Sequence, residues 1–247
     1  MSVRIAPVRI AMWSGPRNIS TAMMRAWENR PDTAVVDEPF YAFYLARTGL
    51  DHPGRDEVLA SQPTDWRTVA AALADEPVPG GRAVFYQKHM THHMLAGVGL
   101  EWTDRVRNAF LIRDPAEVVA SYVQRRGSVD LADIGVERQV ELFDREADRL
   151  GHAPPVVDAR DVLADPGRVL ARLCAALGVP FTDAMLRWPA GRRDTDGVWA
   201  PHWYASVEAS TGFGAPPPPP PPLSGDLARV AEAARPHYEH LHRWRLA

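Results

Sequence analysis

One stretch of the sequence decides the fold, namely Ile10-Ala11-Met12-Trp13-Ser14-Gly15-Pro16-Arg17-Asn18-Ile19-Ser20-Thr21-Ala22-Met23-Met24-Arg25-Ala26-Trp27. It starts with an apolar run typical of a buried strand, turns at a Gly-Pro pair, and then places apolar residues at helical spacing. Asn18, Ser20 and Thr21 offer side-chain oxygens that can cap the helix at its start. The stretch therefore predicts a strand, a tight loop and the beginning of a helix.

The loop of this stretch has the character of an anion site. Consecutive backbone N–H groups at a helix start attract anions, and Arg17 adds a fixed positive fork. The loop differs from the nucleotide kinase and ATPase loop G-x-x-x-x-G-K-[ST], because it has neither the second glycine nor the lysine. We therefore expect a phosphate cradle of another kind, and a Gly-Pro turn that binds nothing is the alternative.

The composition bounds the class of protein. The 247 residues suffice for one α/β domain with a large core, and we expect a single domain over residues 1–247. Lys and Arg total 28 against 31 Asp and Glu, so the net charge of −3 gives no general basic field that would favour nucleic acid. The sole cysteine, Cys174, excludes an internal disulfide and a thiolate zinc site, and it fits a reducing cytoplasm.

The sequence shows no targeting or membrane segment. The start MSVRIAPVRIAMW lacks the apolar core and cleavage site of a signal peptide, and no run approaches the ~20 apolar residues of a membrane span. We expect a cytoplasmic protein without a membrane span, and the sequence does not indicate its oligomeric state.

Four more apolar runs follow, and we expect each to be a short strand: residues 33–37, 83–87, 108–112 and 155–158. Spacing and helix-start signals predict helices over residues 116–126, 136–150, 168–177, 182–186 and 226–244. This alternation predicts an α/β fold with a parallel sheet of about five strands, covered by helices on both faces.

Three segments fall outside this alternation. Residues 41–80 are polar and irregular apart from a helical patch near 68–73, and we expect a lid or an acceptor-side insertion there. Residues 215–223 contain seven consecutive prolines and predict a stiff polyproline spacer before a C-terminal helix within 224–244, with a ligand for an SH3-type partner as the alternative. Residues 191–199 form a turn-rich basic loop.

A second candidate phosphate site follows the predicted strand 108–112. Arg113 lies at the end of this strand, and Ser121 lies two turns into the next helix, so that both can reach one phosphate. A surface ion pair of Arg113 with Asp114 or Glu117, and a solvated position for Ser121, are the alternatives.

Together, the two motifs resemble those of sulfotransferases that use 3′-phosphoadenosine 5′-phosphosulfate (PAPS). The resemblance implies the family's three-layer α/β sandwich, which is similar to P-loop NTPases. It implies that Arg113 and Ser121 bind the 3′-phosphate of PAPS and of its product, 3′,5′-adenosine bisphosphate. It also implies that the first loop binds the 5′-phosphosulfate through Gly15, Pro16, Arg17, Asn18, Ile19, Ser20 and Thr21.

The remaining family elements match less closely. Cytosolic members carry Lys-x-His at the end of the third strand, whereas Lys88 and His89 are adjacent here. Glu38 precedes Pro39 and is similar to the strand-end Glu-Pro of some bacterial and carbohydrate-type members, in which the glutamate is the base. The loop after residue 190 is only loosely similar to the family's glycine-rich loop, with Arg192 and Arg193 as candidate nucleotide ligands.

Three residues at the predicted strand ends are candidates for catalysis. Glu38 would accept the proton of the acceptor hydroxyl if burial raises its pKa, and His89 is the rival base. Lys88 would neutralise the sulfuryl group and the leaving phosphate. A helix cap or a pair with Arg17 is the alternative for Glu38, a solvated strand-end lysine is the alternative for Lys88, and Asp37 is expected to be an orienting acid.

The expected function is transfer of a sulfuryl group from PAPS to a hydroxyl of a small-molecule, glycan or lipid acceptor, in line and with a general base. No metal is expected, because no carboxylate near the His89-x-x-His92-His93 string completes a ligand set. A P-loop nucleotide or small-molecule kinase and a non-catalytic nucleotide-binding module are the alternatives.

Overall fold

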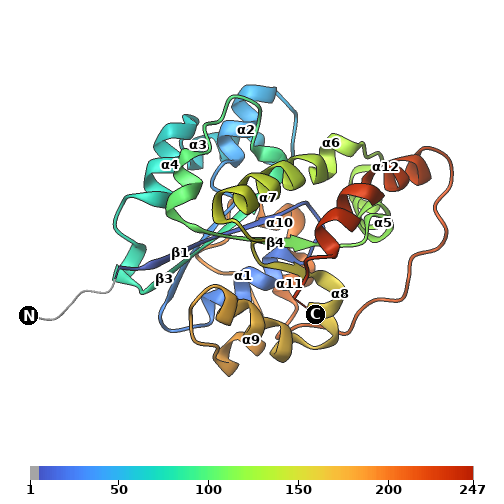
Figure 1. The fold of residues 1–247 in the computed structure, drawn as a ribbon. Helices are drawn as coiled ribbons and strands as arrows, with labels where there is room; N and C mark the ends of the chain where they lie inside the picture. Colours follow the sequence, from blue (N-terminus) through green and yellow to red (C-terminus); the bar gives the residue numbers. More distant parts are fainter. Residues whose placement is uncertain (1–5, 247) are drawn as a thin grey trace, which may run out of the picture.

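The computed structural model describes residues 6–246, without the side chains of residues 125 and 126. A parallel sheet lies at the centre, with its strands in the order β2-β3-β1-β4-β5 (Figure 1). The strands are β1 (Val8–Ser14), β2 (Thr33–Asp37), β3 (Val84–Met90), β4 (Arg107–Ile112) and β5 (Val156–Asp158). The predicted α/β class and the five-stranded parallel sheet are confirmed.

The strand order places a ligand crevice at the middle of the sheet. β1 and β4 are neighbours, but the chain leaves β1 toward β2 on one side and leaves β4 toward β5 on the other. In open parallel sheets, ligands bind at the carboxyl ends of two strands whose connections diverge in this way. The loops after β1 and β4 carry the two predicted phosphate motifs, so both motifs meet at this crevice.

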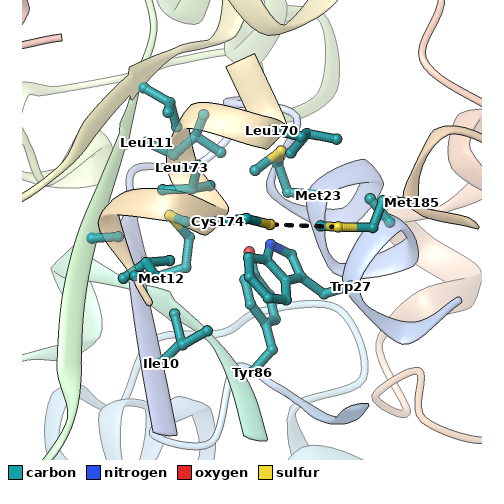
Figure 2. Packing of buried hydrophobic residues seen from close by; sticks show 14 of the residues in the cluster. Ile10, Met12, Met23, Trp27, Tyr86, Leu111, Leu170, Leu173, Cys174 and Met185 are labelled. Atoms are coloured by element: carbon teal, nitrogen blue, oxygen red, sulfur yellow. Dashed lines mark hydrogen bonds between the residues drawn. The ribbon is translucent and has the colours of Figure 1, made fainter. Parts of the chain in front are cut away.

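Helices cover both faces of the sheet (Figure 1). The helix α1 (Ser20–Glu28) and the helix α9 (Pro166–Ala176) pack on one face, where Met23, Trp27 and Leu170 contact the strand side chains (Figure 2). The helices α4 (Trp66–Ala74) and α7 (Val136–Leu150) pack on the other face. Ile10 points to the first face and Ala11 to the second, because successive strand residues alternate.

The remaining elements complete the two helical layers and the connections between them. The α-helices are α2 (Tyr41–Thr48), α3 (Arg55–Ser61), α5 (Pro115–Arg126), α6 (Leu131–Ile134), α8 (Ala159–Ala164), α10 (Ala200–Trp203), α11 (Ala205–Glu208) and α12 (Gly225–His242). Short 3₁₀ turns are η1 (Pro79–Gly81), η2 (Thr91–His93), η3 (Glu101–Arg105) and η4 (Asp183–Leu186). Among the described residues, no helix is both long enough and apolar enough to cross a bilayer.

Most of the predicted helices are present, but residues 41–80 differ from the expectation. This segment contains α2, α3 and α4 and is not irregular. The first five residues of α2 are all buried, so its sequence shows no single apolar stripe: Phe43 packs in the cluster that contains α4, and the other four pack with side chains from α3 and from residues 199–204. The predicted helix over residues 182–186 is the 3₁₀ turn η4.

The proline run has no regular secondary structure and lies beside α5, α8 and α12. Arg160 donates a hydrogen bond of 3.4 Å to the carbonyl of Pro217. A cavity of about 730 Å³ separates Pro219–Pro222 from the ion-paired side chains of Asp114 and Arg235. The spacer role stays a prediction.

Gly15 gives a test of how closely the β1–α1 loop packs. A Cβ atom at Gly15 would lie 2.4 Å from the backbone carbonyl oxygen of Ile134. We expect Gly15→Ala to lower the free energy of unfolding by about 1–3 kcal/mol, because the backbone has to move to admit the methyl group. Urea denaturation measures this loss. Gly167→Ala in α9 is the control, where the added methyl meets only ordinary contacts near 4 Å; equal stability of the two variants would contradict the prediction.

Candidate active site

A cavity of about 420 Å³ lies at the carboxyl edge of the sheet. The β1–α1 loop and the end of β4 form one part of its wall, with Arg17, Arg113 and Ser121. The ends of β2 and β3 form another part, with Glu38 and Lys88. Aromatic and polar side chains close it from α2 and from residues 203–214. The cavity therefore joins residues from both predicted phosphate motifs to two of the predicted catalytic residues.

The β1–α1 loop exposes the start of α1 to this cavity. Arg17 and Ile19 have left-handed backbone, with φ values of 63° and 55°. Loops with such residues gather successive N–H groups into a concave anion site. The predicted side-chain cap is wrong: among the described residues no side chain accepts from the first N–H groups of α1, and the amide of Asn18 instead donates to the carbonyl of Leu111 at 3.3 Å. The N–H groups of the first turn thus have no side-chain acceptor.

The two phosphate motifs are in direct contact. Arg17 Nε donates to Ser121 Oγ at 2.9 Å, and Arg113 Nη1 donates to the carbonyl of Arg17 at 2.7 Å. Arg113 also forms the ion pair with Glu117 that the sequence offered as an alternative to phosphate binding, since its Nε lies 2.8 Å from Glu117 Oε2. Glu117 is shared with Arg160. Arg113 therefore has a fixed position, and it still lines the cavity.

Lys88 forms the centre of a buried polar cluster. Its ammonium donates to Asp37 Oδ1 at 2.7 Å, to Glu38 Oε1 at 2.6 Å and to the hydroxyl of Tyr204 at 2.7 Å. The sheet register explains the first contact, because Asp37 and Lys88 are paired neighbours on β2 and β3. Only 1% of the Lys88 side chain is exposed, so the residue is not the solvated lysine that the sequence left open.

The contacts within the cluster shift the pKa values of Glu38 and Lys88. Burial raises the pKa of Glu38, and the charge of Asp37 raises it further, while the ammonium of Lys88 opposes both. Burial opposes the charge of Lys88, but the carboxylates of Asp37 and Glu38 outweigh this and raise the pKa of Lys88 well above its usual value. Lys88 is therefore a permanent cation beside a carboxyl group that takes up a proton more readily than an ordinary glutamate.

Glu38 has a strained backbone. Its φ of 41° is in the left-handed region, which residues with a side chain rarely adopt. Its N–H donates to the carbonyl of Lys88 at 2.9 Å, and its carbonyl accepts from the N–H of Tyr41 at 3.0 Å. This turn ends β2, starts α2 and directs the Glu38 side chain to the cavity.

His89 does not line the cavity. It follows Lys88 on a strand and therefore points to the opposite face of the sheet. There it stacks on Trp13 with 4.4 Å between ring centroids and lies near Phe40 and Trp102. Its Nε2 lies 3.2 Å from Gln87 Oε1, and burial lowers its pKa to about 3. The arrangement is that of a neutral core histidine, away from the cavity.

Arg192 and Arg193 are also absent from the cavity wall. The backbone N–H of Arg193 donates to Asp196 at 2.8 Å, and its guanidinium donates to the carbonyl of Pro189 at 3.0 Å. Asp196 forms a fully buried ion pair with Arg25 of α1, at 2.6 Å. The basic loop therefore anchors the chain to α1, and residues 203–214 supply the cavity wall after it.

The sequence did not single out Tyr204, whose hydroxyl donates to Asp37 Oδ2 at 2.6 Å. No local signal marks it, since it lies 116 positions from Lys88. The composition did contain a signal for the centre of the cluster. Lys88 is the sole lysine of the chain, and the other residues of its Lys and Arg total are all arginines.

The histidines near the cavity are packed against aromatic rings. His93 stacks on Tyr41 and Tyr44, with ring centroids 4.7 and 4.8 Å apart, and His52 Nδ1 lies 2.8 Å from the hydroxyl of Tyr41. Within residues 6–246, no group of three or more His, Cys, Asp or Glu side chains could hold a metal ion. The absence of a metal stays a prediction.

Comparison with known proteins defines the family. The model of the family described as "Sulfotransferase domain" matches residues 8–244, so the chain belongs to the sulfotransferase-domain family. The expected resemblance is confirmed.

Two similar proteins are known from Arabidopsis thaliana, Branched-chain-amino-acid aminotransferase-like proteins 1 and 2. They are 37% and 34% identical to this chain over 210 and 207 residues, which are 85% and 84% of this chain. The matched regions are 37% and 36% of those proteins, so the chain spans little more than a third of the length of these relatives.

Two solved structures share the fold. The sulfotransferase domain of the Synechococcus PCC 7002 olefin synthase has a TM-score of 0.54 at 18% identity, covering 94% of this chain and 97% of that one. A sulfotransferase from Alicyclobacillus acidocaldarius has a TM-score of 0.54 at 14% identity, covering 97% and 96%. At these identities the two neighbours show that the chain shares their fold.

His89 makes a pH-dependent contribution to stability. The unfolded chain binds a proton at His89 below a pKa of about 6.5, whereas the folded chain does so only near pH 3. The unfolded state therefore binds more protons between these values, and stability falls as the pH drops, by up to about 1.4 kcal/mol per pH unit. Burial also lowers the pKa of His93, which acts in the same direction.

We expect His89→Gln to reduce the change of the free energy of unfolding with pH between pH 6.5 and 4, as measured by urea unfolding at each pH. The exposed His152→Gln is the control and should keep the wild-type slope. A wild-type slope in the His89 variant would show that the histidine is not held neutral in the core.

Proposed function

We propose that the chain transfers a sulfuryl group from PAPS to the hydroxyl of a small-molecule acceptor. The observation that carries this proposal is the single cavity that joins Arg17, Arg113 and Ser121 to Glu38 and Lys88. One part of the wall suits phosphate oxygens, and the other offers a proton acceptor beside a fixed cation. Sulfuryl transfer needs both, because its catalysis consists mainly of positioning and charge stabilisation.

The donor part of the cavity fits a nucleotide with two phosphate positions. Arg17 and the N–H groups of residues 18–21 would bind the 5′-phosphosulfate, assisted by the hydroxyls of Ser20 and Thr21. Arg113 and Ser121 would bind the 3′-phosphate, whose two charges match a guanidinium fork and a hydroxyl. Gly15 does not itself line the cavity, and its lack of a side chain leaves room for the carbonyl of Ile134 beside this loop.

The catalytic part of the cavity supplies a base and a cation. When bound, PAPS supplies a sulfuryl group whose bond to a phosphate oxygen breaks as the acceptor oxygen bonds to sulfur. Glu38 accepts the proton of the acceptor hydroxyl, since burial raises its pKa toward the working pH. Lys88 stabilises the charge that develops on the leaving phosphate. His89 has no part in this mechanism, because it lies in the core.

The acceptor part of the wall is aromatic. Tyr41, His52 and Trp203 line the cavity and would hold the body of the acceptor, which supports an acceptor-side role for residues 41–80. The cytoplasmic location also belongs to the proposal. It is based on the sole cysteine of the chain, Cys174, which leaves no internal disulfide and fits a reducing compartment.

Calorimetry with 3′,5′-adenosine bisphosphate tests the donor. We expect the wild type to bind this nucleotide more tightly than ADP, which lacks the 3′-phosphate. Arg113→Ala should weaken its binding by about 10- to 100-fold, because hydrogen bonds to charged groups contribute about 1.5–3 kcal/mol. Arg229→Ala on the exposed face of α12 is the control and should bind normally.

An equal loss of ADP binding in Arg113→Ala would contradict the 3′-phosphate assignment. Magnesium-dependent turnover of ATP by the wild type would instead favour a kinase. Binding of the bisphosphate without transfer to any hydroxyl would favour a binding module.

Glu38→Gln tests the base. We expect kcat to fall by about 10²- to 10⁴-fold, because the amide cannot accept the proton, while the Michaelis constant for PAPS changes little. In the wild type, kcat should rise with pH through the raised pKa of Glu38, because the base acts only when it is deprotonated.

Steady-state kinetics between pH 5 and 9 measures both effects, and Glu141→Gln, an exposed change on α7, is the control. Normal turnover of Glu38→Gln, together with loss of turnover in His89→Ala, would show that the histidine is the base.

A further inference from the structure

The hydroxyl of Tyr204 is one of the three partners of Lys88 in the polar cluster. It accepts from Lys88 Nζ at 2.7 Å and from Trp199 Nε1 at 3.1 Å, and it donates to Asp37 Oδ2 at 2.6 Å. Only 4% of Tyr204 is exposed, and burial raises the pKa of its hydroxyl well above the usual value, so it stays protonated. A neutral hydroxyl with one donated and two accepted hydrogen bonds has all its hydrogen-bonding positions filled.

The ammonium of Lys88 is equally saturated. It has three N–H donors, and its three partners lie 2.6–2.7 Å away. These partners differ in access. The side chain of Asp37 is 1% exposed and does not line the cavity, whereas Glu38 and Tyr204 both line it; the side chain of Glu38 is 12% exposed and Tyr204 only 4%. Glu38 is therefore the partner nearest to solvent and to an incoming ligand.

We propose that Tyr204 is a positioning residue for sulfuryl transfer: with Asp37, its hydroxyl holds two N–H groups of Lys88 so that the third is directed at Glu38 and the cavity. The inference rests on the proposed function and adds to it a residue that the family motifs do not contain. Asp37 is itself held, since Oδ2 also accepts from the backbone N–H of Gly197 at 3.1 Å. Two partners that cannot move fix the direction of the third N–H.

This arrangement links the base to the cation. When Glu38 takes the proton of the acceptor hydroxyl, its carboxyl becomes neutral and its attraction to Lys88 weakens. The third N–H of Lys88 is then available to the phosphate oxygen that gains the electron pair of the broken sulfur–oxygen bond. Because Asp37 and Tyr204 keep the other two N–H groups, the ammonium needs to turn only slightly.

The sole lysine makes this inference measurable. Protein labelled with ¹⁵N at lysine Nζ gives a single ammonium resonance, that of Lys88. In the wild type, we expect its protons to exchange slowly with water, because all three are hydrogen-bonded and buried. Tyr204→Phe removes one oxygen and keeps the ring, and should speed this exchange by about tenfold or more.

Enzyme kinetics provides the second readout. We expect Tyr204→Phe to lower kcat by about tenfold or more, while the dissociation constant of 3′,5′-adenosine bisphosphate stays within about twofold, since Arg17 and Arg113 are unchanged. Tyr86→Phe is the matched control. The Tyr86 hydroxyl is buried on β3 and has no hydrogen-bond partner within the part of the chain that the structure describes, so its loss should change neither the resonance nor kcat.

Wild-type exchange and kcat in Tyr204→Phe would overturn the inference, as would an equal effect of Tyr86→Phe. Should Tyr204→Phe not fold, uniform 3-fluorotyrosine weakens the phenol as an acceptor and keeps every hydroxyl. An unshifted Lys88 resonance in that protein would also overturn the inference. Failure of the proposed function appears differently, as a wild type that neither binds the bisphosphate nor transfers sulfate, whatever the resonance shows.

Discussion

The structure depends on a buried cation between two carboxylates at the ends of neighbouring strands. Lys88 of β3 contacts Asp37 and Glu38 at the end of β2, and through Tyr204 it also holds the segment that closes the cavity. Burying these charges costs several kcal/mol per ion. The contacts offset this cost only when the ammonium and both carboxylates are present. Loss of the ammonium would leave two carboxylates buried side by side. The cluster is therefore a constraint on folding as well as a source of chemistry.

The geometry of this cluster explains why the chain keeps one lysine among its arginines. Three acceptors converge on a single nitrogen at 2.6–2.7 Å, which suits the tetrahedral ammonium of Lys88. A guanidinium spreads its donors over a flat fork and would not fit them. The donor part of the cavity requires a different cation, because a phosphate presents several oxygens that one flat fork of donors can bind together. There the cations are Arg17 and Arg113; the fork of Arg113 binds Glu117 and the carbonyl of Arg17 at once, and the guanidinium of Arg17 donates to Ser121.

The sequence predicts those parts of the structure that depend on the local spacing of apolar residues. Apolar runs located all five strands, and the rule for parallel sheets brought Glu38 and Lys88 to one edge. The alternation along a strand also contained the signal that separates Lys88 from His89, since adjacent residues face opposite sides. Tyr204 could not be found in this way, because its place in the cluster results from packing between distant segments. The helix α2 was missed because burial on several sides removes the apolar stripe.

Backbone strain shows how the cavity keeps its shape. Within residues 6–246, three residues other than glycine have positive φ, namely Arg17, Ile19 and Glu38, and all three line the cavity. Such conformations cost about 1–3 kcal/mol each and persist only where surrounding contacts enforce them. The carbonyl of Arg17 accepts from Arg113, that of Ile19 from the N–H of Met23, and the N–H of Glu38 donates to Lys88. At Arg17 and Glu38 the strained backbone is thus held by other residues proposed for donor binding and catalysis, so the geometry of the site is set by folding. Preorganised groups of this kind stabilise developing charge without having to reorient when it appears.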